Sequence, residues 1–257
     1  MSPRSRLRLP LSSAALAALI TVLAAAPAGA GWVIFPSPVS PNGRRIYDLY
    51  ELISIPAIII FLFVEVALLL VIVRFRRRRP GHIPPQFHGN TRLELAWTAV
   101  PLVILLMIAA VSLVELRRDF VKPTNAVTSL DVRVTGRQFE WSYTYPKYGF
   151  TVSKDLYVPT GELVRLQVDA TDVIHSWWVP SITGKTDAVP GYSNYTWLNI
   201  SHPGKWHGEC AELCGAGHYS MQTDVIAVSP GDFQAWVAKQ MAKASKPSPS
   251  PSPSPKA

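Results

Sequence analysis

Two cysteines, a histidine and a methionine near the end of the chain have the types and spacing of a metal site. Cys210, Cys214, His218 and Met221 follow one another as C-x3-C-x3-H-x2-M, and the 257-residue chain has no other cysteine. Thiolate, imidazole and thioether donors together favour copper, whereas a structural zinc site has no use for methionine. Two cysteines of an exported domain most often form a disulfide, so a small disulfide loop is the alternative.

Two thiolates in one loop favour a pair of metal ions that share them, because a mononuclear blue-copper site uses a single cysteine. A second imidazole is then needed, and His175 directly follows a predicted strand. Loops that are distant in sequence meet at one end of a β-sandwich, so His175 is the best second ligand, and an ordinary core or surface histidine is the alternative. His202 and His207 lie just before the cluster, and His82 and His88 fall in a segment that we expect in the cytoplasm.

The part of the chain that carries the cluster has the pattern of a β domain. Apolar and polar residues alternate in short runs such as 164–169, and turns with glycine and proline separate these runs. This pattern predicts short antiparallel strands that form a sandwich or barrel over residues 130–228. Pro230 predicts the start of a helix within 229–245, and the Ser-Pro repeat of 246–257 predicts a disordered tail.

Two apolar segments upstream are long enough to cross a membrane. Residues 51–74 and 93–116 carry very little charge in their apolar parts, and about 20 apolar residues span a bilayer core. The segment 75–92 between them is rich in arginine, which keeps a short loop on the cytoplasmic side. We therefore expect residues 31–50 outside the cytoplasm, together with the β domain that follows a linker at 117–129.

The basic composition and the N-terminus fit the same topology. Much of the net charge of +8 comes from the arginines beside the apolar segments, so it does not indicate a nucleic-acid partner. Residues 1–30 contain arginines, an Ala/Leu run and the triplet Ala28-Gly29-Ala30, which predicts a secretory signal peptide. An uncleaved first membrane helix is the alternative. The sequence contains no C-x-x-C-H motif, so we expect no attached c-type haem.

Four stretches carry a resemblance to a known family. They are LELAWTAVP at 93–101, GRQFEWSY at 136–143, DVIHSWWVPSITGKTDAVPG at 172–191 and GECAELCGAGHYSM at 208–221. With the two-helix anchor, the chain resembles subunit II of the haem–copper cytochrome c oxidases over essentially all of the mature sequence. The resemblance implies a two-helix transmembrane hairpin plus an all-β cupredoxin-like Greek-key domain, with a short C-terminal helix.

The resemblance also implies a binuclear copper centre, CuA, and the residues that hold it. Cys210 and Cys214 would bridge the two copper ions. The other ligands would be His175 and His218 on one copper each, with Met221 and the backbone carbonyl of Glu212 as weaker ligands. The carboxylate of Glu212 would bind a magnesium ion at the boundary with the catalytic subunit. Asp187 lies near that boundary in the family and is not expected to be a direct ligand.

The function that the resemblance implies is electron transfer in a respiratory complex. The chain would accept single electrons from cytochrome c or another extracytoplasmic carrier and pass them to haem in subunit I. Oxygen reduction and proton pumping take place in subunit I, so the chain is an oxidoreductase only as part of the complex. Subunit III and the lipid bilayer are further expected partners. The expected location is the plasma membrane of a bacterium, with the CuA domain on the periplasmic side.

In one stretch the chain departs from the family. The position of the tryptophan that receives the electron is taken by Phe139, and Trp141 follows two residues later. Phe139, Trp141 or Tyr143 is expected to receive the electron, and a different docking mode of the donor is an alternative. Ordinary core and rim packing is the other reading of these aromatic residues. Glu94 matches the mouth of a proton pathway, and equally an acidic residue at a helix N-terminus. Glu65 lies inside the first apolar segment and matches no family role, although intramembrane carboxylates normally face protein or water.

Three other functions share some of these features. A quinol oxidase subunit II has the same fold but lacks the copper ligands that this sequence contains. A membrane-tethered protein that binds or delivers copper would not need Glu94 or the W-T-x-x-P motif of the second helix. A structural domain closed by a Cys210–Cys214 disulfide is the third alternative.

Overall fold

The computed structural model describes residues 36–75, 86, 89–120 and 129–245. The chain divides into two units, Met1–Pro36 and Ser37–Ala257, and the second contains nearly all of the described residues. The predicted signal peptide and the Ser-Pro tail lie outside the described residues. Most of the arginine-rich segment and most of the predicted linker lie outside them as well.

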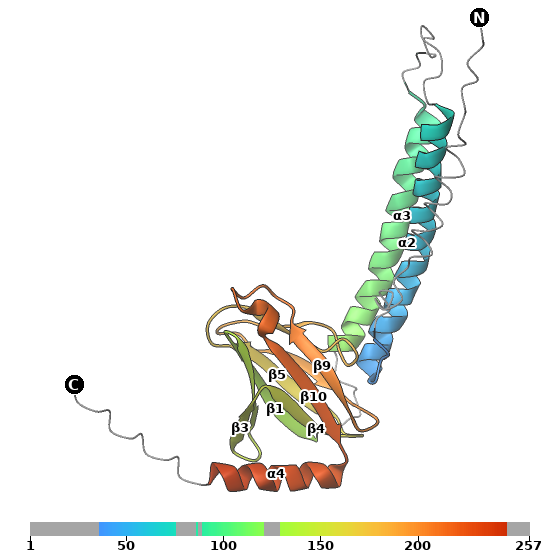
Figure 1. The fold of residues 1–257 in the computed structure, drawn as a ribbon. Helices are drawn as coiled ribbons and strands as arrows, with labels where there is room; N and C mark the ends of the chain where they lie inside the picture. The colour runs from blue at the N-terminus through green and yellow to red at the C-terminus, as the bar shows by residue number, and fades with distance from the viewer. Residues whose placement is uncertain (1–35, 76–85, 87–88, 121–128, 246–257) are drawn as a thin grey trace, which may run out of the picture. The chain divides into compact units, whose positions relative to one another are not determined.

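Two long helices, α2 (Pro41–Arg74) and α3 (Thr91–Phe120), lie side by side and expose apolar side chains along most of their length (Figure 1). Both are long and apolar enough to cross a membrane. The first helix begins at Pro41, earlier than the apolar segment that starts near residue 51. The hydroxyl of Ser40 accepts a hydrogen bond from the Gly43 N–H at 3.0 Å, and Pro41 fits the first turn. The segment predicted at 31–50 is therefore helical from residue 41 onward.

The first turn of α2 is part of the packing of the strand domain. The Gly43 N–H donates a hydrogen bond to the Ile182 carbonyl at 3.0 Å. The side-chain amide of Asn42 donates to the Trp197 carbonyl, also at 3.0 Å, and Asn42 is only 1% exposed. The hairpin is thus joined to the strand domain by buried hydrogen bonds at the start of its first helix.

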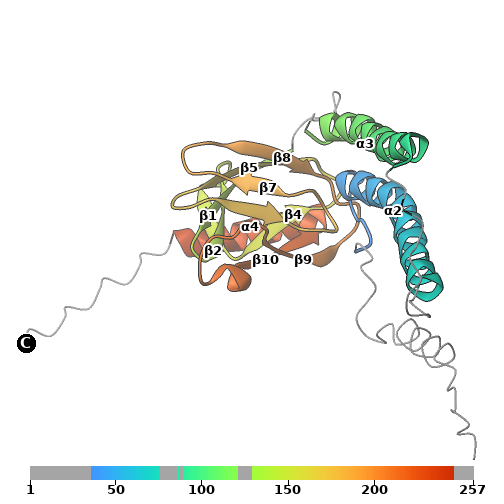
Figure 2. The same cartoon turned by 90° about the horizontal axis from the view of Figure 1, so that it is seen from above.

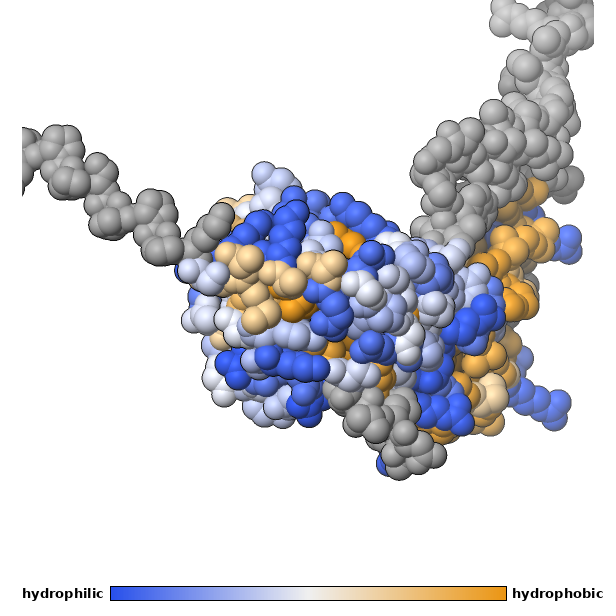
Figure 3. Space-filling view, turned by 90° about the horizontal axis from the view of Figure 1, so that it is seen from below, coloured by the Kyte–Doolittle hydropathy of each residue, from blue (hydrophilic) through white to orange (hydrophobic). Residues whose placement is uncertain are grey.

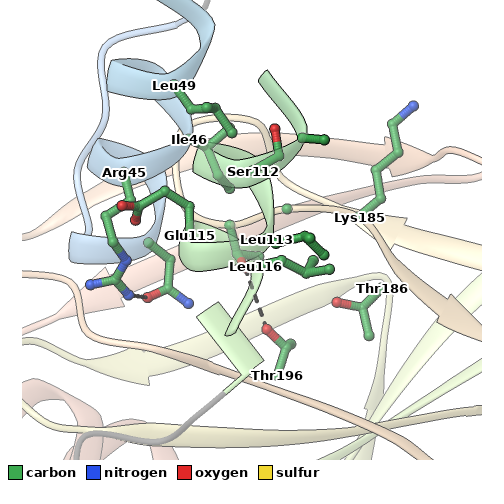
Figure 4. Close-up of a pocket in the computed structure, with 14 residues that line it drawn as sticks. Arg45, Ile46, Leu49, Ser112, Leu113, Glu115, Leu116, Lys185, Thr186 and Thr196 are labelled. Atoms are coloured by element: carbon green, nitrogen blue, oxygen red, sulfur yellow. Dashed lines mark hydrogen bonds between the residues drawn. The ribbon is translucent and has the colours of Figure 1, made fainter. Parts of the chain in front are cut away.

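A cavity of about 650 Å³ lies beside this contact, where α2 and α3 meet the segment 183–186 (Figure 4). Ile46 of α2 and Leu113 and Leu116 of α3 form part of its apolar wall. Thr196 of the strand domain lines the opposite part of the wall. The helices therefore contact the strand domain closely at the start of α2, and next to this contact a cavity separates them from it.

The strand domain is a sandwich of two five-stranded sheets (Figure 2). Its strands are β1 (Leu130–Arg137), β2 (Glu140–Tyr145), β3 (Phe150–Ser153), β4 (Asp155–Pro159), β5 (Val164–Ala170), β6 (His175–Trp178), β7 (Thr186–Ala188), β8 (Asn194–Leu198), β9 (Gly204–Cys210) and β10 (Gln222–Val228). One sheet has the order β3-β2-β1-β5-β8 and the other the order β4-β10-β9-β6-β7.

Two of the strand pairs are parallel. β1 pairs with β5 and β10 pairs with β4 in parallel, so the predicted antiparallel arrangement is wrong for these pairs. The reason is the connection between the sheets: after β3 the chain crosses to the other sheet as β4 and returns beside β1 as β5. A crossover of this kind allows two strands to run in the same direction.

The core lies between the two sheets. The apolar residues of β5 are buried and alternate with more exposed ones, which is the pattern of a strand with one face on a core. Tyr143 of β2 links the sheets, because its hydroxyl lies 2.5 Å from the Thr223 hydroxyl and accepts a hydrogen bond from the Trp177 indole N–H at 3.0 Å. All three side chains are buried. The core therefore contains a satisfied polar group that fixes one sheet relative to the other.

The helix α4 (Pro230–Ala244) covers the end of the sandwich opposite the loop between β9 and β10 (Figure 1). Ser229 caps its N-terminus, Phe233 is buried, and Trp236 stacks on Tyr157 with ring centroids 4.5 Å apart. Hydrophilic residues cover most of the strand-domain surface in Figure 3, in contrast to the exposed apolar residues of α2 and α3.

Candidate metal centre

The loop between β9 and β10 brings the residues of the C-x3-C-x3-H-x2-M motif together. Cys210 ends β9, and Met221 stands directly before β10. These strands pair antiparallel, and the Cys210 N–H donates a hydrogen bond to the Met221 carbonyl at 2.9 Å. The short helix η1 (His218–Ser220) turns the loop back toward the strands. The first and last residues of the motif are therefore neighbours across a strand pair.

His175 reaches the same place from another part of the sequence. It is the first residue of β6, which pairs with β9 so that Trp177 lies opposite Cys210. The Ala211 N–H donates to the Ser176 carbonyl at 2.8 Å and continues this pairing into the loop. His175 is fully buried. The predicted second histidine therefore lies beside the cluster because two strands of one sheet are adjacent.

The side chains of the predicted ligands face one another. The sulfur atoms of Cys210 and Cys214 lie 3.9 Å apart, and both thiols are free. The other short distances are 3.9 Å from His175 Nδ1 to Cys210 Sγ, 3.6 Å from His218 Nδ1 to Cys214 Sγ, 3.9 Å from Met221 Sδ to Cys214 Sγ and 3.3 Å from the Glu212 carbonyl oxygen to Cys210 Sγ. All six predicted donor groups thus gather at one end of the sandwich.

These donors fit a copper centre with shared thiolates. A metal–thiolate bond is about 2.3 Å long, so two sulfurs that share one metal ion lie at most about 4.6 Å apart. The observed separation of 3.9 Å satisfies this condition. The ligand atoms of His175, Cys210 and Cys214 lie within 4.8 Å of one another, and an imidazole nitrogen stands beside each sulfur. Soft sulfur donors with imidazole suit copper better than hard cations.

The electrostatics of the two thiols also favour a cation. Burial, and after it the neighbouring Cys210, raise the pKa of the Cys214 thiol to about 11. A cation bound beside the two sulfurs would offset both effects and favour the thiolate form of Cys214. Metal binding here would therefore release thiol protons.

Asp172 orients His175, and the sequence analysis did not identify it. Its carboxylate lies 2.9 Å from His175 Nε2 and accepts hydrogen bonds from the backbone N–H groups of Val173 and Gln138. Burial would raise the pKa of Asp172, but these hydrogen bonds outweigh it and lower the pKa to about 2. An ionised Asp172 accepts a hydrogen bond from the Nε2–H of His175, which keeps the proton on Nε2 and leaves the lone pair of Nδ1 toward the sulfurs. The D-x-x-H spacing was the signal available in the sequence.

The two aromatic residues that were expected to receive the electron have different surroundings. Phe139 is 36% exposed and covers the ligand loop so closely that a Cβ atom added to Gly217 would lie 2.4 Å from its ring. Trp141 is fully buried, and its ring meets that of His175 edge-on with centroids 5.9 Å apart. Only Phe139 therefore offers both a solvent-facing edge and contact with the loop.

The other acidic residues of the sequence analysis lie on α3, α2 and β7, and Asp187 of β7 pairs across the sheet with Ser176, next to His175. Glu94 caps the start of α3: the Asn90 N–H donates to its carboxylate at 3.2 Å, and the Leu93 N–H donates to the Asn90 side chain at 3.2 Å. Glu65 is exposed on α2, and Asp187 is exposed on β7. Glu94 thus has the structural role of a helix cap within this chain.

Comparison with known proteins agrees with this architecture. The family model described as "Cytochrome C oxidase subunit II, periplasmic domain" matches residues 149–228, and the one described as "Cytochrome C oxidase subunit II, transmembrane domain" matches residues 25–114. Cytochrome c oxidase subunit 2 of Alkalihalophilus pseudofirmus is 38% identical over 216 residues, which cover 82% of this chain and 63% of that protein. The match therefore spans less than two thirds of that relative.

Two further relatives extend the comparison. The subunit 2 relative from Rickettsia bellii is 32% identical over 227 residues, which cover 80% of this chain and 83% of that protein. The crystal structure of the periplasmic domain of cytochrome oxidase subunit II from Bradyrhizobium japonicum is 32% identical, with a TM-score of 0.45, and covers 46% of this chain and 96% of that one.

Two membrane-length helices ahead of a β-sandwich with a cysteine–histidine cluster define a membrane-anchored domain with a candidate metal centre at one end. Within that class, the chain belongs to the subunit II family of cytochrome c oxidase. The predicted family and fold class are thereby confirmed. The named relatives are subunits of an oxidoreductase complex, and the two helices together with the matched periplasmic domain fit a membrane protein with its strand domain outside the cytoplasm.

Proposed function

We propose that this chain carries the CuA centre of its oxidase, accepting single electrons from an extracytoplasmic carrier such as cytochrome c and passing them to haem in subunit I. The observation that carries the proposal is the pair of free thiols 3.9 Å apart, each beside an imidazole nitrogen. When bound there, two copper ions would supply a centre that takes up and releases one electron. Oxygen reduction and proton pumping would remain with subunit I.

The residues of the chain would hold this centre with little freedom to move. Cys210 and Cys214 would bridge the metals, and His175 and His218 would each bind one. Cys210 and His175 lie on paired strands, so their separation is fixed by sheet hydrogen bonds. Met221 and the Glu212 carbonyl would complete the site as weaker ligands. A rigid ligand set favours electron transfer because little reorganisation accompanies the change in charge.

We further propose that the electron arrives through Phe139. Its exposed edge and its packing on Gly217 support this assignment, whereas Trp141 is buried behind His175. If a reduced carrier docked over Phe139, only the Phe139 ring would lie between the carrier and the loop that bears Cys214 and His218. This route replaces the tryptophan that the family uses at the same position.

The Glu212 side chain is proposed to bind magnesium with the catalytic subunit. The residue is exposed, so its carboxylate is accessible to a partner, while its backbone carbonyl oxygen lies 3.3 Å from Cys210 Sγ. Glu212→Gln should leave the copper content of the purified complex unchanged and lower its magnesium content, as measured by elemental analysis. An unchanged magnesium content would remove Glu212 from the magnesium site.

Glu94 is proposed as the mouth of a proton pathway in addition to its role as a helix cap.

The plasma membrane of a bacterium is the proposed location, with the strand domain in the periplasm and subunit III as a further partner. The two membrane-length helices and the arginine-rich segment between them support this topology.

Electron delivery can be tested in the complete oxidase complex by stopped-flow spectroscopy. Reduced cytochrome c is mixed with the anaerobic oxidised complex, and haem reduction is followed at its absorption band. Cys210→Ser should abolish fast haem reduction, whereas Ser220→Ala, in the same loop, should retain it. Equal rates in the wild type and Cys210→Ser would contradict the proposed function.

A further inference from the structure

The turn between β1 and β2 touches both loops that carry the proposed ligands. Gln138 lies in this turn, 76 positions before Cys214 and 34 before Asp172. Its side-chain amide donates a hydrogen bond to the Cys214 carbonyl at 2.5 Å. Its backbone N–H donates to the carboxylate of Asp172 at 2.8 Å. One residue is therefore bonded to both loops at once.

The two hydrogen bonds extend to the proposed ligands themselves. Cys214 is the residue whose carbonyl is held, so the bond restrains the backbone of a bridging thiolate. On the other side, Asp172 lies 2.9 Å from His175 Nε2. A continuous chain of polar contacts thus runs from Cys214 through Gln138 and Asp172 to His175.

Glycine residues in the ligand loop confirm that the turn and the loop are in close contact. A Cβ atom added to Gly215 would lie 2.8 Å from the side-chain nitrogen of Gln138, and Gly215 has a φ of +131°. At Gly217, an added Cβ would meet the Phe139 ring at 2.4 Å. A larger residue at either position would push the turn away from the loop.

We propose that Gln138 is a positioning residue that clamps the two ligand-bearing loops together around the metal centre. This inference rests on the proposed function, since the loops need a fixed separation only when they share a metal centre. The side-chain amide restrains Cys214 and the backbone N–H restrains His175 through Asp172. Hydrogen bonds to the ligand residues from residues that do not bind the metal set the orientation of the ligands. Removing such a hydrogen bond commonly lowers metal affinity by roughly 10- to 100-fold.

The test compares two glutamine substitutions in the full chain, purified in detergent and loaded with copper. Gln138→Met keeps the size of the side chain and removes the donor to Cys214. Gln167→Met is the matched control, because the Gln167 side chain donates one hydrogen bond to Ser193 at 2.9 Å on β5, away from the ligand loops. For each protein, copper loss to a chelator, the copper hyperfine pattern in EPR, the midpoint potential and the melting temperature are measured.

The clamp predicts that Gln138→Met loses copper about tenfold faster and shows an altered hyperfine pattern and midpoint potential. Gln167→Met should match the wild type in copper loss, hyperfine pattern and midpoint potential. Because both variants lose one neutral hydrogen bond, their melting temperatures should be lowered by similar amounts. Gln138→Met with wild-type copper retention and spectra would overturn the inference alone. Wild-type protein without a two-copper centre would overturn the proposed function and the clamp together.

A second variant keeps the test decisive if Gln138→Met does not fold. Gln138→Glu keeps the length and polarity of an exposed turn residue, and an ionised carboxylate cannot donate to the Cys214 carbonyl. It should show the same faster copper loss. Retention equal to that of Gln167→Met would contradict the clamp.

Discussion

At the scale of single residues, the candidate centre depends on which nitrogen of each histidine faces the sulfurs. Both His175 and His218 present Nδ1, at 3.9 Å and 3.6 Å from the nearest sulfur. For His175 the choice is fixed by Asp172, whose carboxylate accepts a hydrogen bond from the Nε2–H. The predicted ligand His175 is thus oriented by a neighbour that is not itself a predicted ligand.

Phe139 provides a test at this scale. Phe139→Ala in the oxidase complex should slow electron uptake from reduced cytochrome c roughly tenfold, within the one to three decades over which association rates vary among mutants of one interface. The optical spectrum of the copper centre should stay unchanged, because the ring is not a ligand. Stopped-flow mixing measures the rate. Tyr195→Ala, a half-exposed aromatic on β8, is the control and should leave the rate unchanged.

An effect of Tyr195→Ala equal to that of Phe139→Ala would contradict the assignment of Phe139 as the docking point. A wild-type rate in Phe139→Ala would do so as well.

The residues of the centre could be predicted from the sequence to different degrees. Cys210, Cys214, His218 and Met221 lie within one loop, so their spacing alone indicated a metal site. Gln138 could not be found in this way, because its contact with Cys214 depends on how a turn 76 positions earlier packs on the loop. Local spacing shows which donors are close in sequence, and it contains no information about which turn covers them.

At the scale of elements, paired strands and one helix start position the site. β6 and β9 bring His175 beside Cys210, and the first turn of α2 is held by the segment that follows β6. That segment contains Ile182, whose carbonyl accepts the Gly43 N–H. The helix α2 is therefore connected, through the segment after β6, to the strand that carries the predicted ligand His175.

Gly43 tests this connection. A Cβ atom at position 43 would lie 2.6 Å from the backbone oxygen of Ser181, which cannot move without shifting the chain. Gly43→Ala should lower the free energy of unfolding by about 1–3 kcal/mol, a typical cost of overpacking. Gly231→Ala in α4 is the control, because its nearest contact would be 4.0 Å away, and should change stability by less than about 0.5 kcal/mol.

Thermal unfolding of the full chain in detergent, followed by circular dichroism, gives both values. Equal stability of the two variants would show that the start of α2 is not held closely against the strand domain.

The elements themselves were predictable where a local pattern specifies them. The apolar length of 51–74 and 93–116 indicated the helices, and the alternation in runs such as 164–169 indicated strands. The parallel pairs of β1 with β5 and of β4 with β10 were not predictable, because they depend on crossovers between the sheets. The start of α2 was also missed, since its first turns are polar and were outside the apolar segment.

At the scale of the whole molecule, the strand domain must keep its two sheets fixed for the centre to persist. Tyr143 and Tyr145 contribute to this, because both are fully buried with bonded hydroxyl groups. The Tyr145 hydroxyl donates to the Tyr157 carbonyl at 2.8 Å and accepts the Tyr157 N–H at 2.9 Å. Burial raises the pKa of both phenols well above the ordinary value of 10.

These raised pKa values predict a loss of stability in alkali. In the unfolded chain the phenols ionise near pH 10, whereas in the folded domain they stay neutral to a higher pH. The stability that the two buried phenols contribute is therefore fully present below pH 10. It is lost as the pH rises from 10 toward the pKa of the phenols in the folded domain. Each buried tyrosine should lower the free energy of unfolding by about 1.4 kcal/mol per pH unit in this window.

Tyr145→Phe separates this effect from other alkaline titrations. It should cost about 1–3 kcal/mol at neutral pH, because two partly buried backbone groups of Tyr157 lose their partner. It should also make the free energy of unfolding fall less steeply above pH 10, because one buried phenol fewer ionises on unfolding. Tyr195→Phe, at a half-exposed tyrosine, should change neither quantity. Chemical unfolding followed by tryptophan fluorescence measures both, and an unchanged alkaline slope in Tyr145→Phe would contradict the assignment.

The central claim is that two thiolates of one chain share two copper ions. It is tested most directly by loading the full chain in detergent with copper and recording the copper-to-protein ratio and the EPR spectrum. The claim predicts two copper ions per chain and a seven-line hyperfine pattern, from one unpaired electron shared by two equivalent copper nuclei. One copper per chain with a four-line pattern, or colourless protein with a Cys210–Cys214 disulfide, would contradict it.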